Sequence, residues 1–361
     1  MPEPVFVGHD LYRQAAYGSH HPLAIPRVET ATDLCRALGW LGEGEMQLSP
    51  IASEEQLARF HTPGYIRALR RASQTGAVDP EVKRRHAIGT MENPLFPGLF
   101  ERAATSVGGS IRAAELALGG RIAFHPAGGT HHGRPDHASG FCYFNDPVFA
   151  ILTLLEGGAE RVLYVDLDAH HGDGVQDAFE QDRRVHTVSI HEQNRWPYTG
   201  AAADVAAGRA RNLPVPKGFN DSELEALVEG TVLPLAGRIR PDAVVITCGA
   251  DALAGDPLSS MELSNVALWS VVERLAGLAS AAVVLGGGGY NPWTVARYWA
   301  GLWGRLSGRT IPDALPGPAR AVLEPLHCDL IDDEDIREAW RETLADAPNR
   351  GPVRKEIHEL V

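Results

Sequence analysis

Short apolar runs recur along the chain and alternate with longer stretches in which apolar and polar residues mix. Runs rich in Val, Ile, Leu and Ala are typical of strands that are buried on both faces of a parallel sheet. The expected strands are Val5–Gly8, Arg121–His125, Val162–Asp168, Val185–His191, Ala243–Cys248 and Ala282–Gly286. Between them, stretches such as Leu224–Ile239 and Asn265–Leu278 are rich in Ala, Leu and Glu and predict helices. The alternation predicts an α/β fold, a central and mostly parallel β-sheet flanked by helices on both faces.

A single domain accommodates this pattern. The chain has 361 residues and no Pro/Ser-rich linker, internal repeat or heptad run, and single α/β domains reach this length. We therefore expect residues 1–361 to form one domain, with catalytic motifs over 126–290 and a C-terminal helical tail over about 320–361. The least regular stretch, Gly200–Pro216, is expected to be a surface loop.

Carboxylate and imidazole groups gather directly after one apolar run. The run Arg161–Val165 leads into the motif DLDAHHGDG, and alternate residues of an extended segment project to the same face. Asp166, Asp168 and His170 should therefore face one spot at the end of a strand, where parallel α/β sheets place their active sites. Because unpaired buried charge is costly, the cluster predicts a divalent metal ion and hydrolytic chemistry.

Three other apolar runs end in groups of the same kind. The motif PAGGTHHGRPDHASGFCYFND follows one run and carries the adjacent histidines His131 and His132. A second run is followed by Asp251, and a third leads through four glycines to Tyr290. Glycines let the backbone turn tightly and pass close to another group. Together with the other strand ends, this makes Tyr290 a candidate hydroxyl donor.

The charge balance bears on the choice of partners. The chain has 33 Lys and Arg against 46 Asp and Glu, a formal net charge of −13. Binding to a phosphate backbone needs clustered positive charge, so no nucleic-acid partner is expected. An acidic surface can attract cationic substrates. No apolar stretch approaches the length that spans a bilayer, so no membrane association is expected either.

Cysteine usage and the N-terminus favour a cytoplasmic location. The N-terminal residues Met-Pro-Glu-Pro lack the features of a secretory signal. Without a C-x-x-C pair, a disulfide framework or a thiolate zinc site is not expected. The cysteines concerned are Cys35, Cys142, Cys248 and Cys328.

These motifs resemble those of the zinc-dependent histone deacetylase family, above all its class I branch and the bacterial acetoin utilization proteins and histone deacetylase-like amidohydrolases. Besides the motifs above, the matching segments are His20–Leu23, Ile25–Val28, Phe60–Tyr65, Asn93–Phe100 and Gly289–Arg297. The resemblance implies the arginase/deacetylase fold. It also implies hydrolysis of acetyl, or other short acyl, groups from the Nε atom of lysine in proteins.

The metal site follows from the same resemblance. It implies that Asp168, His170 and Asp251 bind Zn²⁺ with an open position, as catalytic zinc sites do. Such ligands also suit Fe²⁺, so that ion is a second candidate in the cell. The family further binds K⁺ beside the zinc, largely through backbone carbonyls. The matching potassium residues are Asp166, Asp168, His170, Ser189 and Ile190.

The resemblance also implies the catalytic roles. His131 should donate to Asp166, and His132 should donate to Asp173. Such a carboxylate fixes the tautomer of an imidazole and raises its basicity. We assign His132 as general base and then general acid, and His131 as mainly electrostatic. Tyr290 should donate to the tetrahedral oxyanion.

A substrate channel is implied by four further residues. Phe141 matches an aromatic wall, and Trp196 stands where a phenylalanine is usual for the opposite wall. Two aromatic rings can hold the four-carbon stem of lysine by apolar contact. The carbonyl of Gly140 is expected to accept the N–H of the substrate amide, and Leu258 matches an apolar residue at the rim.

Two residues depart from the family pattern. Glu92 stands where an aspartate clamps the substrate backbone, so a looser or shifted clamp is expected. Thr130 replaces the usual leucine beside the inner cavity near Arg27, which would make that cavity more polar. His171 and Asp256 are expected to be structural neighbours of the site rather than participants.

Three alternatives to a protein deacetylase are open to such a sequence. An acylpolyamine or other small-molecule amide hydrolase would share the catalytic set and suit the acidic surface. A module that binds acyl-lysine without hydrolysing it would not need the complete set of metal ligands, histidines and tyrosine that is present here. An arginase-like enzyme with two manganese ions would need a second group of metal carboxylates, which the pattern does not supply.

Overall fold

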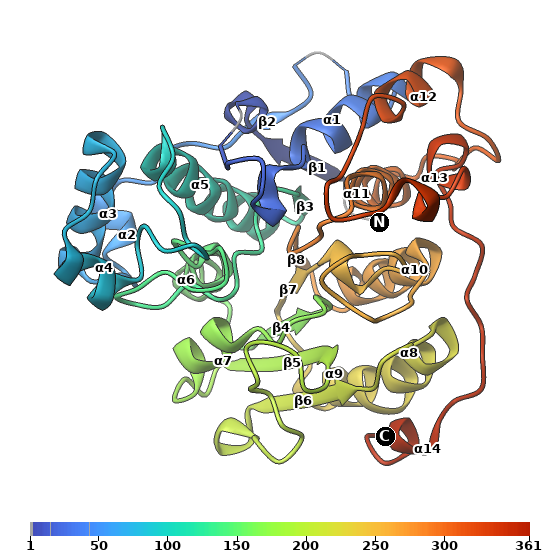
Figure 1. The fold of residues 1–361 in the computed structure, drawn as a ribbon. Helices are drawn as coiled ribbons and strands as arrows, with labels where there is room; N and C mark the ends of the chain where they lie inside the picture. Colours follow the sequence, from blue (N-terminus) through green and yellow to red (C-terminus); the bar gives the residue numbers. More distant parts are fainter. Residues whose placement is uncertain (1–2, 15, 43) are drawn as a thin grey trace.

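A central parallel sheet organises the computed structural model, which describes residues 3–14, 16–42 and 44–361 (Figure 1). The strands of the described chain are β1 (Pro4–Gly8), β2 (Gln47–Leu48), β3 (Ile122–His125), β4 (Val162–Asp166), β5 (Val185–Glu192), β6 (Ala210–Val215), β7 (Ala243–Thr247) and β8 (Ala281–Leu285). They form one sheet in the order β2-β1-β3-β8-β7-β4-β5-β6. Every neighbouring pair is parallel. The predicted fold class is confirmed.

Helices cover both faces of the sheet. The α-helices of the described residues are α1 (Val28–Ala37), α2 (Glu54–Leu57), α3 (Pro63–Thr75), α4 (Pro80–His86), α5 (Leu99–Leu118), α6 (Asp146–Glu156), α7 (Asp173–Phe179), α8 (Asp221–Leu227), α9 (Leu233–Ile239), α10 (Asn265–Ala276), α11 (Pro292–Leu306), α12 (Gly317–Leu323), α13 (Ala339–Glu342) and α14 (Lys355–His358). Helices α5 and α6 lie on one side of the sheet, and α1, α10 and α11 lie on the other (Figure 1). A π-turn, Val228–Val232, joins α8 to α9 in the predicted helical stretch Leu224–Ile239.

Strand β7 shows why the sheet is buried on both faces. Val244 and Ile246 pack into the cluster that includes α10 and α11. Ala243 and Val245 point the other way, into the cluster that includes α5 and α6. All four are fully buried, and each fully buried Val or Ile stabilises the fold by about 1.5–3 kcal/mol. The uninterrupted apolar run is therefore a consequence of covering by helices on both sides.

The segment 200–216 differs from its expected conformation. It contains the edge strand β6, which pairs with β5, rather than a surface loop alone. Asn212 is polar and Pro214 is rare in strands, so these two residues interrupt the apolar pattern by which the strand could be recognised in the sequence. Asn212 is buried because its amide donates to Gln176 at 2.8 Å. Pro214 is tolerated because an edge strand does not need every N–H group in the ladder.

The C-terminal tail also differs from expectation. It is helical in the short segments α12, α13 and α14 and in the 3-10 turn Asp333–Asp335, and α14 is reached through an extended strap (Figure 1). Pro348 and Pro352 interrupt the region, since proline provides no N–H group for a helix. The strap is held by Arg354, whose Nε lies 2.6 Å from a carboxylate oxygen of Glu223 on α8.

Across the described ranges, none of the helices combines the length and the apolar character that a membrane crossing requires.

Candidate metal centre and active site

Three potential metal ligands converge at the carboxyl ends of β4 and β7. These strands are adjacent, with Asp166 paired to Thr247, so the residues that follow them meet at one edge of the sheet. One ligand atom each from Asp168, His170 and Asp251 lies within 4.8 Å of the others. The Nδ1 atom of His170 is 3.2 Å from Asp168 Oδ1 and 3.0 Å from Asp251 Oδ2. All three residues are buried.

Two glycines leave room for this triad. A Cβ atom on Gly288 would lie 2.1 Å from Oδ2 of Asp251, and one on Gly249 would lie 2.3 Å from Oδ2 of Asp168. The backbone N–H of Gly288 donates to Asp168 at 2.6 Å, and that of Ala169 donates to Asp251 at 3.0 Å. The glycine backbone thus fits closely around the carboxylates and orients them.

The charge of the triad suits a divalent cation. Burial, together with the negative charge of Asp168, raises the pKa of Asp251 to about 6. Two buried carboxylates that destabilise each other in this way are relieved by a metal ion. Two oxygens and one nitrogen as ligands, with Asp168 and His170 bordering a cavity, leave one side open for substrate. The residues present therefore fit a catalytic metal site.

The two histidines of the second motif lie beside the triad, each with the aspartate partner that the sequence predicts. The Nδ1 atom of His131 is 2.7 Å from Asp166 Oδ2, and that of His132 is 2.7 Å from Asp173 Oδ1. Because a carboxylate only accepts, each Nδ1 carries the proton. The Nε2 atom of each ring is then the one that is free for other chemistry. The two rings are tilted by 51° to each other, with centroids 3.9 Å apart.

The environments of the two histidines separate their pKa values. Burial opposes the charge on His131, but the nearby carboxylates of Asp166 and Asp168 outweigh it and raise its pKa to about 9. Burial and the positive charge of His131 lower the pKa of His132 to about 3. These opposite shifts favour the charged form of His131 and the neutral form of His132 at neutral pH.

Several residues that the sequence analysis missed hold this arrangement. Asn145 donates through Nδ2 to the carbonyls of His131 and Gly133, at 3.1 and 2.9 Å. The hydroxyl of Tyr164 donates to Asp166 at 2.6 Å. Arg134 forms an ion pair with Asp173. Signals were present for two of them: Tyr164 precedes Asp166 by two residues on a strand, and Arg134 lies inside the histidine motif.

A cavity of about 610 Å³ leads from the surface to the triad. Its lining includes the four predicted channel residues, Phe141, Trp196, Gly140 and Leu258. The indole of Trp196 lies edge-on to His132, with centroids 4.7 Å apart. The aromatic wall and the general-base candidate are therefore in direct proximity.

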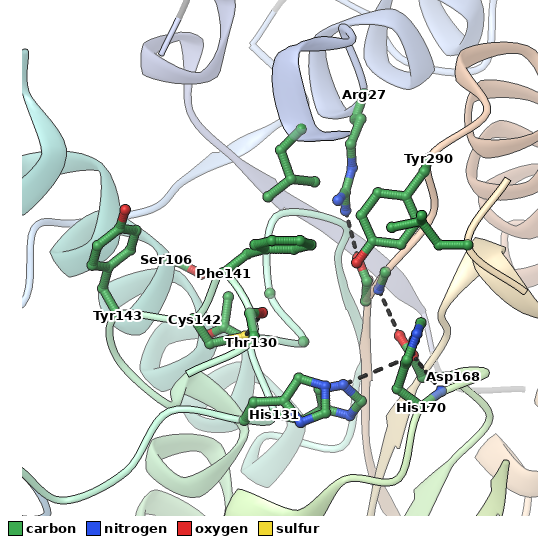
Figure 2. A pocket seen from close by; sticks show the side chains of 18 of the residues that line it. Arg27, Ser106, Thr130, His131, Phe141, Cys142, Tyr143, Asp168, His170 and Tyr290 are labelled. Carbon is green, nitrogen blue, oxygen red and sulfur yellow. Dashed lines mark hydrogen bonds and ion pairs between the residues drawn. The ribbon is translucent and has the colours of Figure 1, made fainter. Parts of the chain in front are cut away.

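Tyr290 also lines the cavity, next to Phe141, with ring centroids 5.9 Å apart (Figure 2). Its backbone N–H donates to Asp256 Oδ2 at 2.7 Å, and the N–H of Leu258 donates to Asp256 Oδ1 at 2.9 Å. Asp256 thus positions two cavity residues, in keeping with its expected structural role. Burial raises the pKa of the Tyr290 hydroxyl well above its usual value, so it stays protonated and can donate.

Glu92 and Thr130, the two departures from the family pattern, each make defined hydrogen bonds. The carboxylate of the exposed Glu92 accepts from the N–H of Gly140 at 2.7 Å, so it contacts the channel wall itself. The hydroxyl of Thr130 lies 2.6 Å from the carbonyl of Phe144 and 2.5 Å from Asp146 Oδ1. Thr130 lines the cavity, with its hydroxyl engaged at the start of α6, and the expected effect on cavity polarity stays a prediction.

Two of the residues predicted to bind potassium lie on neighbouring strands. Asp166 on β4 is paired with Ser189 on β5, so these two residues are neighbours in the sheet.

The side chain of His171 contacts Thr199 and Gln176, at 2.8 and 3.1 Å. It therefore supports the surrounding loops rather than the cavity.

Comparisons with known proteins agree with this geometry. Residues 21–306 match the model of the histone deacetylase domain family. The chain is 36% identical to histone deacetylase 8 of Xenopus tropicalis over 298 residues, which cover 80% of each chain. It is 33% identical over 324 residues to the acetoin utilization protein AcuC of Bacillus subtilis, covering 85% of this chain and 83% of that protein. The crystal structure of a histone deacetylase homologue from Aquifex aeolicus superposes with a TM-score of 0.95 at 35% identity, covering 99% of this chain and 98% of that one.

Proposed function

The chain belongs to the histone deacetylase family, and we propose that it is a zinc-dependent hydrolase that removes acetyl and other short acyl groups from the Nε atom of lysine in proteins. Family membership supports deacetylase activity as such. The observation that carries the proposal is His132, bonded through Nδ1 to Asp173, beside a buried carboxylate–imidazole triad at the end of an aromatic channel.

The proposed metal is zinc, held by Asp168, His170 and Asp251. A divalent cation bound there would polarise the carbonyl of the amide and lower the pKa of a bound water molecule. Three protein ligands and an open side are typical of catalytic zinc sites. Fe²⁺ accepts the same ligands. We also propose a structural K⁺ at Asp166, Asp168, His170, Ser189 and Ile190, supported by the pairing of Asp166 with Ser189.

The proton transfers in this mechanism belong to His132. Its Nδ1–H is held by Asp173, so Nε2 is the atom that accepts a proton from the attacking water. The same atom then gives this proton to the amide nitrogen as the C–N bond breaks, so the lysine amine leaves neutral. His131, a cation held by Asp166, stabilises negative charge that develops beside it.

Tyr290 and the channel act on the substrate itself. The phenol of Tyr290 donates to the oxygen of the tetrahedral species, on which negative charge accumulates. Phe141 and Trp196 hold the aliphatic stem of lysine by apolar contact and exclude water from the site. Glu92 and the carbonyl of Gly140 are proposed to contact the backbone and the amide N–H of the substrate at the mouth.

A turnover assay on a mixed panel tests this proposal. Purified zinc-loaded protein is given acyl-lysine peptides and acetylated polyamines, and kcat/KM is compared, with His132→Ala as the matched inactive control. We expect acetyl-lysine peptides to be the better substrates. An advantage of orders of magnitude for polyamines would instead support the small-molecule alternative, which the net charge of −13 favours.

The cytoplasm, predicted from cysteine usage, is the proposed location.

A further inference from the structure

Two walls of the lysine channel come from loops that are far apart in the sequence. Trp196 lies in the loop after β5, and Leu258 lies in the loop after β7; both border the cavity. Asp256 ties Leu258 to Tyr290, but it does not contact the loop of Trp196. The separation of the two walls therefore depends on a different contact.

Arg195, the residue next to Trp196, provides that contact. Its guanidinium donates through one terminal nitrogen to the carbonyl of Leu258 at 2.7 Å. The other terminal nitrogen donates to the hydroxyl of Ser260 at 3.1 Å. A planar guanidinium with several fixed donors holds two acceptors in a defined geometry. Arg195 thus bridges the two loops, and it borders the cavity beside Trp196 and Leu258.

Glu192 holds the guanidinium from the other side. Its carboxylate pairs with Nε of Arg195 at 2.5 Å and with a terminal nitrogen at 2.9 Å. One oxygen also accepts from the N–H of Ser260 at 2.7 Å. Glu192 is 2% exposed and the side chain of Arg195 is 24% exposed, so this bidentate pair is partly shielded from water and better defined in geometry than an exposed ion pair. The four groups form a closed network that spans both loops.

The indole of Trp196 is confined on its far side as well. It lies edge-on to His132, with centroids 4.7 Å apart. A Cβ atom on Gly140 would lie 2.4 Å from the indole, so the opposite segment already touches the ring. Any change in how Arg195 holds the loop must therefore appear as a change at the Leu258 side of the channel.

We propose that Arg195 is a positioning residue that sets the separation of Trp196 and Leu258 and thereby the affinity for a long, linear side chain. The proposal rests on the proposed function, because it takes acyl-lysine as the occupant of the channel. Arg195 acts through the two walls and does not touch the reacting amide. Its loss should weaken binding of ligands that fill the channel and leave the chemistry at the triad intact.

The test combines a variant series with ligands of two lengths. Arg195→Met removes the bridge, Arg195→Lys keeps one cationic donor, and Glu192→Gln/Arg195→Met avoids a buried unpaired carboxylate. Arg305→Met, which breaks the pair with Glu273 between α11 and α10, is the matched control. Each zinc-loaded protein is titrated calorimetrically with acetohydroxamate, which is too short to fill the channel, and with a hydroxamate on a six-carbon chain. KM and kcat for an acetyl-lysine peptide are measured in parallel.

We expect Arg195→Met and the double variant to lose about tenfold or more in affinity for the long hydroxamate and to raise KM similarly. Affinity for acetohydroxamate and kcat should change by less than about twofold. Arg195→Lys should lie between, and Arg305→Met should match the wild type. Equal losses for the short and long ligands, or no loss for either, would overturn the proposal. Lack of turnover in the wild type would refute the proposed function, while the calorimetric comparison would still report on Arg195.

Discussion

The Nδ1 atom of His132 lies 2.7 Å from Oδ1 of Asp173, the first residue of α7. This contact fixes the tautomer of His132, which lines the cavity, and leaves Nε2 without the proton. His131 makes the same kind of contact with Asp166, yet burial and charge leave the two rings in opposite protonation states. The division of labour between the histidines follows from these surroundings.

Replacing His132 by Ala should remove the proton shuttle. We expect kcat to fall by about 10²–10⁴, with the metal content unchanged because His132 is not one of the three ligands. His131→Ala should cost less, since its role is electrostatic. Steady-state kinetics at neutral pH, with zinc measured by elemental analysis, decides between them. An equal or larger loss at His131 would reverse our assignment of roles.

The pH profile gives an independent check on the same pair. The charge on His131 is one of the causes that lower the pKa of His132, so His131→Ala should raise that pKa. The base must be neutral to act, and a raised pKa leaves it protonated at mildly acidic pH. The acid limb of kcat/KM should therefore move to higher pH. In Asp173→Asn, which removes an interaction that raises this pKa, the limb should move the opposite way. An acid limb that stays in place in both variants would contradict this account.

Tyr290→Phe tests the proposed oxyanion donor. Loss of one such donor typically costs about 10²–10³ in kcat, and KM should change far less because the bond forms mainly in the transition state. Tyr298→Phe is a suitable control, since that tyrosine is buried in the core among the residues packed around α11 and is not one of the residues that line the described cavity. Near-normal kcat in Tyr290→Phe with zinc bound would make Tyr290 a packing residue.

Gly288, whose backbone packs against the triad, should be essential for metal binding. A Cβ on Gly288 would lie 2.1 Å from Asp251 Oδ2, so Gly288→Ala must displace a ligand. We expect this variant to lose most of its bound metal and its activity. Gly237→Ala on α9, where a Cβ meets nothing within 4 Å, should bind metal normally and unfold at the same or a slightly higher temperature. Full metal content in Gly288→Ala, by elemental analysis, would show that the cradle tolerates a side chain.

The strand ends and the catalytic set could be predicted from the sequence because short, dense motifs follow long apolar runs. β4 and β7 are buried on both faces, so their residues form uninterrupted apolar patterns that lead to Asp168 and Asp251. Such local patterns determine which residues reach the same edge of the sheet. They also give the family resemblance its specificity.

Contacts that depend on tertiary packing could not be predicted in this way. The strand β6 was missed because the amide of Asn212 is satisfied by Gln176, a residue in another element. The direction of the Thr130 hydroxyl depends on Asp146 and Phe144. Arg195 reaches a carbonyl 63 positions away, and nothing in its own segment indicates that partner.

The central claim is that the buried Asp168, His170 and Asp251 triad holds one catalytic metal ion. Metal-free protein should be titrated with Zn²⁺ while turnover of an acetyl-lysine peptide and metal content are measured in the same samples. Our account predicts no activity without metal and a linear rise that saturates at one equivalent per chain, with Co²⁺ or Fe²⁺ also restoring activity. Asp251→Asn should bind zinc weakly and need a large excess. Full activity in protein shown by elemental analysis to be metal-free would contradict the account.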